Sequence, residues 1–165
     1  MVESVQRTSG LLVSEQLVMM EIEAADDLEA VDILANRLLE EGIVKPSFIS
    51  AVKKREIEFC TGLQFEDMGI AIPHTDVEHV NEGAIGIGIL KHPIQFKSMG
   101  MPEIPVPVEM IFMIAILEPH KQVELFQTLM PIFQMEGRLK SMKACGTAKE
   151  VTELFKAYLS EPAQI

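Results

Sequence analysis

Cysteine is scarce in this sequence, which contains only Cys60 and Cys145. Two thiols without a Cys-x-x-Cys pair exclude a disulfide-rich framework. The chain also begins without the charged-then-apolar segment that marks a secretory leader. We therefore expect both cysteines to be reduced thiols that behave as small apolar side chains, in a cytoplasmic protein.

Positive charge is scarce as well. The 165 residues include 14 Lys and Arg against 25 Asp and Glu, which gives a net charge of −11, and no basic stripe follows the chain. Binding to a nucleic-acid backbone requires clustered Lys and Arg, so we expect no nucleic-acid partner. The longest apolar run, 108–117, contains Glu109 and is far shorter than the roughly 20 residues that cross a bilayer. Direct membrane insertion is therefore not expected.

The motifs of several common enzyme classes are missing. Gly83, Gly86 and Gly88 lie inside an apparent strand, not at a strand-to-helix turn, so they do not form a phosphate-binding glycine loop. The sequence contains no Gly-x-Ser-x-Gly elbow of the kind that marks a serine hydrolase. The sequence therefore gives no sign of a nucleotide or other organic cofactor.

The pattern of apolar residues indicates an α/β fold. Short apolar runs that are typical of buried strands occur at 17–22, 70–72, 84–90 and 108–117. Apolar residues recur at helical spacing over 28–39, 46–57, 120–133, 139–142 and 147–159. Strands that alternate with helices predict a three-layer α/β arrangement, and with no visible linker or repeat we expect one domain over 1–165.

Some local features follow from the same patterns. Residues 92–107 contain four prolines, so we expect a loop there. The helical stripes place Ile57 and Val123 among the inward-facing residues. Gly86 and Gly88 alternate with isoleucines, which is compatible with close packing on one face of the strand.

Histidine is the residue type that remains for chemistry. His74 follows the strand at 70–72, and His120 follows the strand at 108–117. Carboxyl ends of parallel strands lie at one edge of a sheet, where α/β proteins bind ligands. His120 also opens a helix, whose positive end favours an anion and a neutral imidazole. Arg55 has a planar guanidinium that suits phosphate.

A metal site is a weaker interpretation of the histidines. It would be built from His74, His79 and His120. Carboxylate or thiolate ligands at persuasive spacing are missing, which argues against zinc.

A longer motif surrounds His74. Arg55-Glu56-x-x-x-x-Thr61-Gly62, followed by Gly69-Ile70-Ala71-Ile72-Pro73-His74, resembles the signature of the fructose/mannitol/galactitol-type enzyme IIA domain of the bacterial phosphoenolpyruvate:sugar phosphotransferase system. The resemblance extends to Leu117-Glu-Pro-His120 and the helix after it, where many members have a second active-site histidine. The Arg55-to-His74 spacing is more similar to the galactitol branch than to the mannitol branch. Cys60 stands where the family commonly has proline.

The resemblance implies a phosphorelay. His74 would accept a phosphoryl group from phosphorylated HPr and pass it to a cysteine of an enzyme IIB during sugar uptake, while His120 and Arg55 hold the phosphoryl oxygens. It also implies a mixed sheet of about five strands between helices, and no metal or organic cofactor. The nitrogen-related branch suggests an alternative, a regulatory module whose phosphorylation state controls a protein partner.

Overall fold

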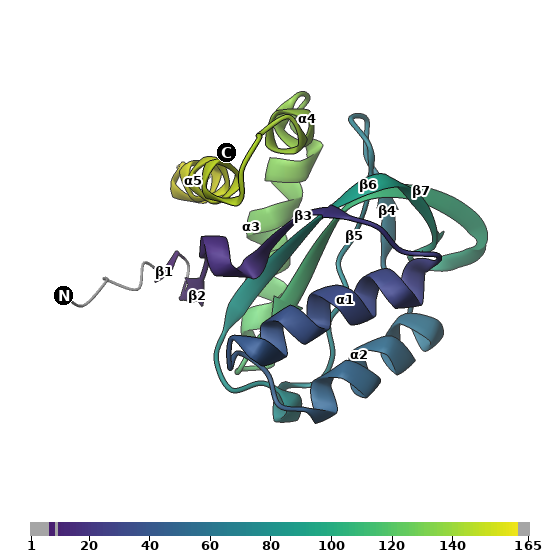
Figure 1. The fold of residues 1–165 in the computed structure, drawn as a ribbon, viewed down its shortest axis with the longest axis vertical. Helices are drawn as coiled ribbons and strands as arrows, with labels where there is room; N and C mark the ends of the chain where they lie inside the picture. The colour runs from purple at the N-terminus through teal and green to yellow at the C-terminus, as the bar shows by residue number, and fades with distance from the viewer. Residues whose placement is uncertain (1–6, 9, 162–165) are drawn as a thin grey trace.

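In the computed structural model, a mixed sheet lies between two layers of helices (Figure 1). The structure describes residues 7–8 and 10–161. The strands are β1 (Arg7–Thr8), β2 (Leu11–Leu12), β3 (Val18–Ile22), β4 (Gly62–Gln64), β5 (Gly69–Ala71), β6 (Ala84–Ser98) and β7 (Met101–Ala115). The α-helices are α1 (Asp27–Glu40), α2 (Ser47–Glu58), α3 (Lys121–Gln134), α4 (Arg138–Lys143) and α5 (Ala148–Ser160). Two short 3₁₀ helices are η1 (Glu15–Leu17) and η2 (Val77–His79).

The sheet is mixed because its strands pair in both senses. β6 and β7 form a long antiparallel hairpin, whereas β3 runs parallel to β6 and β5 runs parallel to β7. Within the described residues the sheet has seven strands, of which β1 and β2 are 2 residues long and the other five are longer. The predicted mixed sheet of about five strands is therefore confirmed.

The helices lie on both faces of the sheet, as Figure 1 shows, with α1 and α2 on one side and α3, α4 and α5 on the other. A hydrophobic core lies on each face of the sheet, and β7 contributes side chains to both. Phe112 and Ile114 pack toward α3 and α5, while Ile111 and Met113 pack toward α1 and α2. A strand with both faces buried reads as one continuous apolar run. The predicted three-layer α/β fold is confirmed.

Glycines in β6 leave room for side chains of α1 and β3 that pack on one face of the sheet. A Cβ added to Gly86 would lie 2.6 Å from Cδ1 of Leu38, and one added to Gly88 would lie 2.8 Å from Cδ1 of Ile22. Both distances are shorter than real Cβ contacts, so the two glycines leave the space that Leu38 and Ile22 fill. The prediction of close packing on this face is confirmed.

The expected loop at 92–107 is wrong, because β6 and β7 continue through it. Gln95 pairs with Pro107, and Lys97 pairs with Pro105. An antiparallel ladder uses alternate N–H groups, so two prolines spaced two residues apart need not interrupt it.

Two predicted inward positions are wrong as well. Ile57 and Val123 each expose 62% of their surface. Helix α2 buries Phe48, Val52 and Glu56 at four-residue spacing, so the inward position near its end belongs to Glu56 and not to Ile57.

Candidate functional site

His74 lies where β5 ends beside β7. The backbone at His74 forms a parallel bridge with Ile114, and the N–H of Ile114 donates to the carbonyl of Pro73 at 3.0 Å. The histidine follows Pro73, which removes one backbone donor and biases Ile72 toward an extended backbone. Only 9% of the His74 surface is exposed. His74 therefore lies at the edge formed by the carboxyl ends of these parallel strands, as the sequence predicted.

Two contacts orient the imidazole ring. Nδ1 lies 2.8 Å from the carbonyl oxygen of Ile72, and the ring meets that of Phe126 edge-on, with centroids 5.5 Å apart. A carbonyl oxygen only accepts hydrogen bonds, so Nδ1 carries the proton. In the neutral ring, Nε2 then holds the free lone pair and is the nucleophilic nitrogen.

The surroundings favour that neutral ring. Burial lowers the pKa of His74 below its ordinary value of 6.5, and the nearby charge of Arg55 lowers it further. The hydrogen bond to Ile72 and the charge of Asp76 act in the opposite direction. An imidazole that stays unprotonated near neutral pH is ready for nucleophilic attack.

Gln122 contacts the Nε2 nitrogen of His74, and sequence reasoning missed it. Its Nε2 lies 3.3 Å from Nε2 of His74. Gln122 is half-buried in the first turn of α3, four residues before Phe126, which also contacts His74. Residues four apart share a helix face, so this spacing was the signal that could have identified Gln122.

His120 lies two residues earlier in the chain and is largely exposed. Its Nε2 pairs with a carboxylate oxygen of Glu118 at 3.4 Å, and 72% of its side chain is exposed. His120 is the N-cap residue before α3, but its side chain makes no capping hydrogen bond. Between the parts of the chain that the structure describes, no hydrogen bond joins His120 to His74.

Arg55 lies in the last turn of α2, close enough for its charge to act on His74. Its Cζ lies 5.1 Å from the ring centroid of Phe59. Its Nε is buried without a hydrogen-bond partner among the described residues. A buried donor without an acceptor costs free energy, so this nitrogen has unused capacity to bind an anion.

A buried hydrogen-bond chain leads from α2 to His74. The carboxylate of Glu56 accepts hydrogen bonds from the backbone N–H of Thr61 at 2.9 Å and from its hydroxyl at 2.8 Å. The Thr61 hydroxyl oxygen accepts the N–H of Ile72 at 3.1 Å, and the Ile72 carbonyl receives Nδ1 of His74. Burial raises the pKa of the Glu56 carboxyl to about 7, although the bonds from Thr61 act against this. Glu56 thus positions the histidine loop from inside the protein.

Cys60 has a structural contact in this region. The residue is buried, and its Sγ donates to the carbonyl of Ser98 at 3.4 Å. It therefore ties the loop after α2 to the end of β6. None of the contacts described at His74 involves this thiol.

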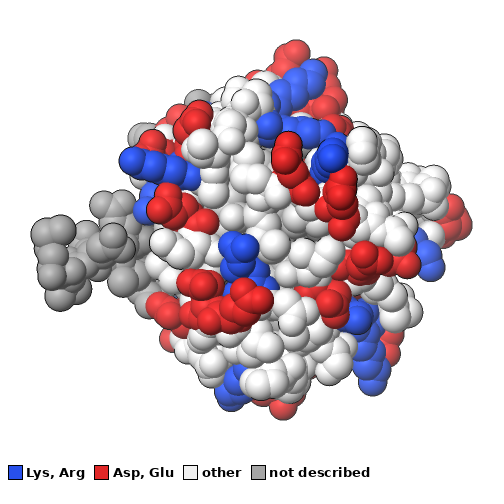
Figure 2. All heavy atoms as spheres, in the orientation of Figure 1, with Lys and Arg blue, Asp and Glu red and all other residues white. Residues whose placement is uncertain are grey.

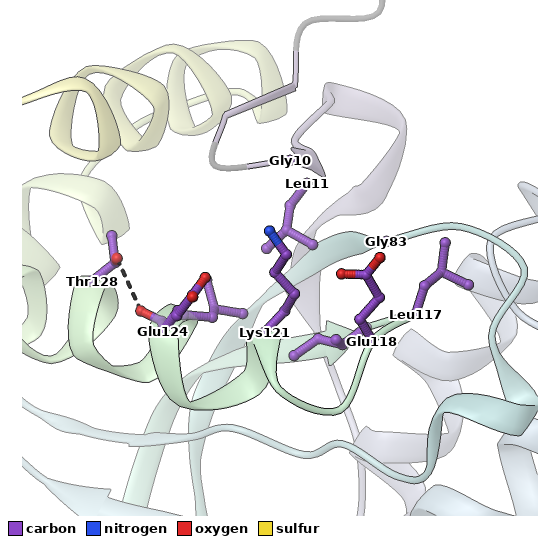
Figure 3. A pocket seen from close by; sticks show the side chains of 10 residues that line it. Gly10, Leu11, Gly83, Leu117, Glu118, Lys121, Glu124 and Thr128 are labelled. Atoms are coloured by element: carbon purple, nitrogen blue, oxygen red, sulfur yellow. Dashed lines mark hydrogen bonds between the residues drawn. The ribbon is translucent and has the colours of Figure 1, made fainter.

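A pocket of about 510 Å³ lies beside the start of α3 (Figure 3). Lys121 and Glu118 line it together with Leu11, and His74 is not part of its lining. Lys121 and Gln122 are consecutive, so their side chains leave the helix in different directions. The pocket and the histidine site therefore lie on different sides of the same helix start.

The surface charges, the possible metal ligands and the helices add three further observations. On the face shown in Figure 2, Lys and Arg lie among Asp and Glu and form no continuous basic area. Within the described residues, no three His, Cys, Asp or Glu side chains are grouped as metal ligands would be. None of the helices in that part of the chain has both the length and the apolar character needed to cross a bilayer.

Comparison with known proteins identifies the family. The family model "Phosphoenolpyruvate-dependent sugar phosphotransferase system, EIIA 2" matches residues 11–158. The galactitol-specific EIIA component of Escherichia coli is 28% identical over 108 residues, which cover 66% of this chain and 71% of that protein.

Solved structures share the fold. The crystal structure described as a PTS IIA (PtxA) from Streptococcus mutans has a TM-score of 0.74 at 21% identity, over 90% of this chain and 92% of that one. Enzyme IIAMTL of Escherichia coli, solved in complex with phosphorylated enzyme IIBMTL, has a TM-score of 0.70 at 20% identity, over 89% and 99% of the two chains.

Proposed function

Because the chain belongs to the EIIA 2 family of the phosphoenolpyruvate-dependent sugar phosphotransferase system, we propose that His74 accepts a phosphoryl group from phosphorylated HPr and passes it to a cysteine of an enzyme IIB. The family assignment makes the protein a phosphocarrier component of a sugar phosphotransferase system. The proposal treats residues 1–165 as one phosphocarrier domain, and the family match over 11–158 supports this.

The observation that carries the proposal is the state of the His74 ring. Nδ1 donates to the Ile72 carbonyl at 2.8 Å, which leaves the Nε2 lone pair available. Burial keeps the pKa of this imidazole low, so the nucleophile does not need to lose a proton before it attacks. Phosphoryl transfer depends mainly on positioning and charge stabilisation, and both are provided around this ring.

Arg55 is the proposed cation of the site. Its unpartnered Nε and its nearby charge support a role in holding phosphoryl oxygens. His120 remains a prediction for the same role, and its exposed side chain would have to turn away from Glu118 to take it.

The partners are proposed from the relatives. Enzyme IIAMTL was solved with phosphorylated enzyme IIBMTL, which supports an enzyme IIB as the acceptor here. The galactitol relative makes galactitol the first sugar system to test. Phe59 and Val123 are more than half exposed and lie on the two segments that reach His74, so they provide apolar area for transient docking.

The experiment is phosphorylation with phosphoenolpyruvate, enzyme I and HPr, followed by intact mass under neutral-to-basic conditions that preserve phosphohistidine. We expect the mass of one phosphoryl group on the parent protein and none on His74→Ala. A second incubation with enzyme IIB should remove the group. A parent protein that gains no mass from a verified donor would refute the proposal, and a phosphorylated protein that discharges to no enzyme IIB would favour the regulatory alternative.

A further inference from the structure

The contact between Gln122 and His74 has a defined direction. Nε2 of the His74 ring has no proton when Nδ1 donates to Ile72, so it accepts a hydrogen bond at 3.3 Å from the Gln122 side chain. The amide oxygen of Gln122 cannot take this place, because two acceptors would face each other. The Gln122 amide therefore turns its N–H toward the lone pair of the reactive nitrogen.

The contacts around the ring limit how it can respond. Ile72 holds Nδ1, and Phe126 lies 5.5 Å from the ring centroid in an edge-on arrangement. Because these contacts hold the ring in place, access to Nε2 is controlled more readily by movement of the Gln122 side chain. Gln122 is half-buried and lies in the first turn of α3, so its amide end can move without disturbing the core.

We propose that Gln122 is a catalytic residue of phosphoryl transfer at His74. In the unphosphorylated protein its amide N–H covers the Nε2 lone pair, and during transfer the same N–H donates to a phosphoryl oxygen. This inference rests on the proposed function and deepens it. It gives Gln122 the hydrogen-bonding role that the family resemblance implied for His120.

The chemical step balances without a proton transfer at Nε2. The Nε2 lone pair forms a bond to phosphorus, and the bond between phosphorus and the donor histidine nitrogen breaks. The electron pair of that broken bond stays on the donor nitrogen. Nδ1 of His74 keeps its proton, and its hydrogen bond to Ile72 stabilises the positive charge on the phosphorylated ring.

An uncharged donor suits a group that must be passed on. A hydrogen bond from a neutral amide is weaker than one from a cation, so Gln122 stabilises the transferring group without holding it as strongly as a lysine would. Arg55, whose charge already acts on His74, provides the positive charge.

The test compares four variants in the phosphorylation assay with HPr. Q122A should slow phosphorylation of His74 on the order of 100-fold, because a donor to the transferring group is lost. Q127A removes an exposed glutamine from the same helix and should match the parent. Q122A should also lose more activity than H120A. Q122E places a carboxylate against the phosphoryl group and should be slower than Q122A.

A second measurement needs no phosphoryl donor. Titration of His74 by NMR in the unphosphorylated protein should give a higher imidazole pKa in Q122A than in the parent. The N–H of Gln122 stabilises the unprotonated ring, so its removal favours the protonated one. The pKa should be higher again in Q122E, whereas Q127A should leave the titration unchanged.

The outcomes separate this inference from the function on which it rests. No phosphorylation of the parent refutes the proposed function itself. A phosphorylated parent with Q122A as fast as Q127A, and with H120A the slowest, overturns the role of Gln122 and restores that of His120. Slow transfer in Q122A with an unchanged His74 titration also overturns it, because the hydrogen bond to Nε2 would then be absent in solution.

Discussion

Two segments meet at His74, and they are built differently. The segment from α2, residues 55–61, acts from inside the protein, where buried Glu56 and Thr61 reach the backbone of Ile72 through hydrogen bonds. The segment from α3, residues 120–126, reaches the ring through half-buried Gln122 and the edge-on contact of Phe126. We infer that the first segment fixes the imidazole, and that the second remains open to the incoming group.

The largest expected effect comes from removing the charge of Arg55, which lies in the segment from α2. Arg55→Ala should slow phosphorylation of His74 by about 10³-fold, because a cation on the transferring group is lost. The pKa of His74 should rise in this variant, since the Arg55 charge lowers it. The measurements are transfer kinetics and NMR titration. Arg55→Lys keeps the charge and should recover part of the rate, and an unchanged rate in Arg55→Ala would remove Arg55 from the site.

Disrupting the buried hydrogen-bond chain should lower the stability of the protein. Thr61→Val removes the hydroxyl that donates to Glu56 and accepts from Ile72, and it should lower the free energy of unfolding by about 1–3 kcal/mol. Urea denaturation measures this loss. Thr152→Val is the matched control, because that buried hydroxyl only donates to a carbonyl of its own helix at 2.8 Å. Equal losses in the two variants would contradict a special role for the Thr61 hydroxyl.

The raised pKa of Glu56 predicts that the stability of the protein depends on pH. Burial raises its folded-state pKa from 4.5 to about 7, so its stabilising contribution is complete below pH 4.5 and is lost as the pH rises through 7. Between pH 5.5 and 8.5 this loss is on the order of 2 kcal/mol in the free energy of unfolding.

The measurement is urea unfolding of the parent and Glu56→Gln at both pH values. The contribution of His74 has the opposite sign, because its lowered pKa makes stability fall as the pH drops below 6.5. That contribution is common to both proteins and cancels in the comparison. Glu56→Gln should be less stable throughout but flatter with pH, and parallel curves would contradict the raised pKa.

The smallest expected effect concerns the exposed ring beside Arg55. Phe59→Leu removes the ring over which Cζ of Arg55 lies at 5.1 Å, a contact worth about 0.5–1 kcal/mol at an exposed site. Transfer to His74 should slow by roughly twofold to fivefold, because that energy also holds Arg55 in place. Tyr158→Leu removes a similar ring over Arg138 at 4.3 Å and should leave transfer unchanged. A loss of rate in both variants would point to a general structural effect.

The sequence motif pointed to the segment 55–61 beside His74, but it did not point to Gln122 in the segment 120–126. Arg55, Thr61 and His74 belong to one motif and to elements whose order was readable. Gln122 was missed because a histidine two residues away is a more conspicuous candidate than an amide. The direction of a side chain in the first turn of a helix depends on where the helix begins, and a shift of two residues turns it to another face.

Much of the fold was readable for a different reason. Helix α1 begins after Asp26, whose carboxylate accepts the N–H of Glu29 at 2.9 Å, and α5 begins after Thr147 in the same way. These caps are local, so short stretches of sequence determine them. The pairing of 92–107 was missed because it depends on the partner strand, which no local pattern of prolines reveals.

The β6–β7 hairpin also has a consequence for how the protein folds. Its two 15-residue strands are adjacent in the sequence, so their pairing closes a short loop. The bridge between His74 and Ile114 spans 40 positions and uses a strand of that hairpin as its template. We therefore expect the hairpin to form early and His74 to reach its position late. In pulse-labelled hydrogen exchange, the amide of Ile87 in β6 should then gain protection before that of Ile72.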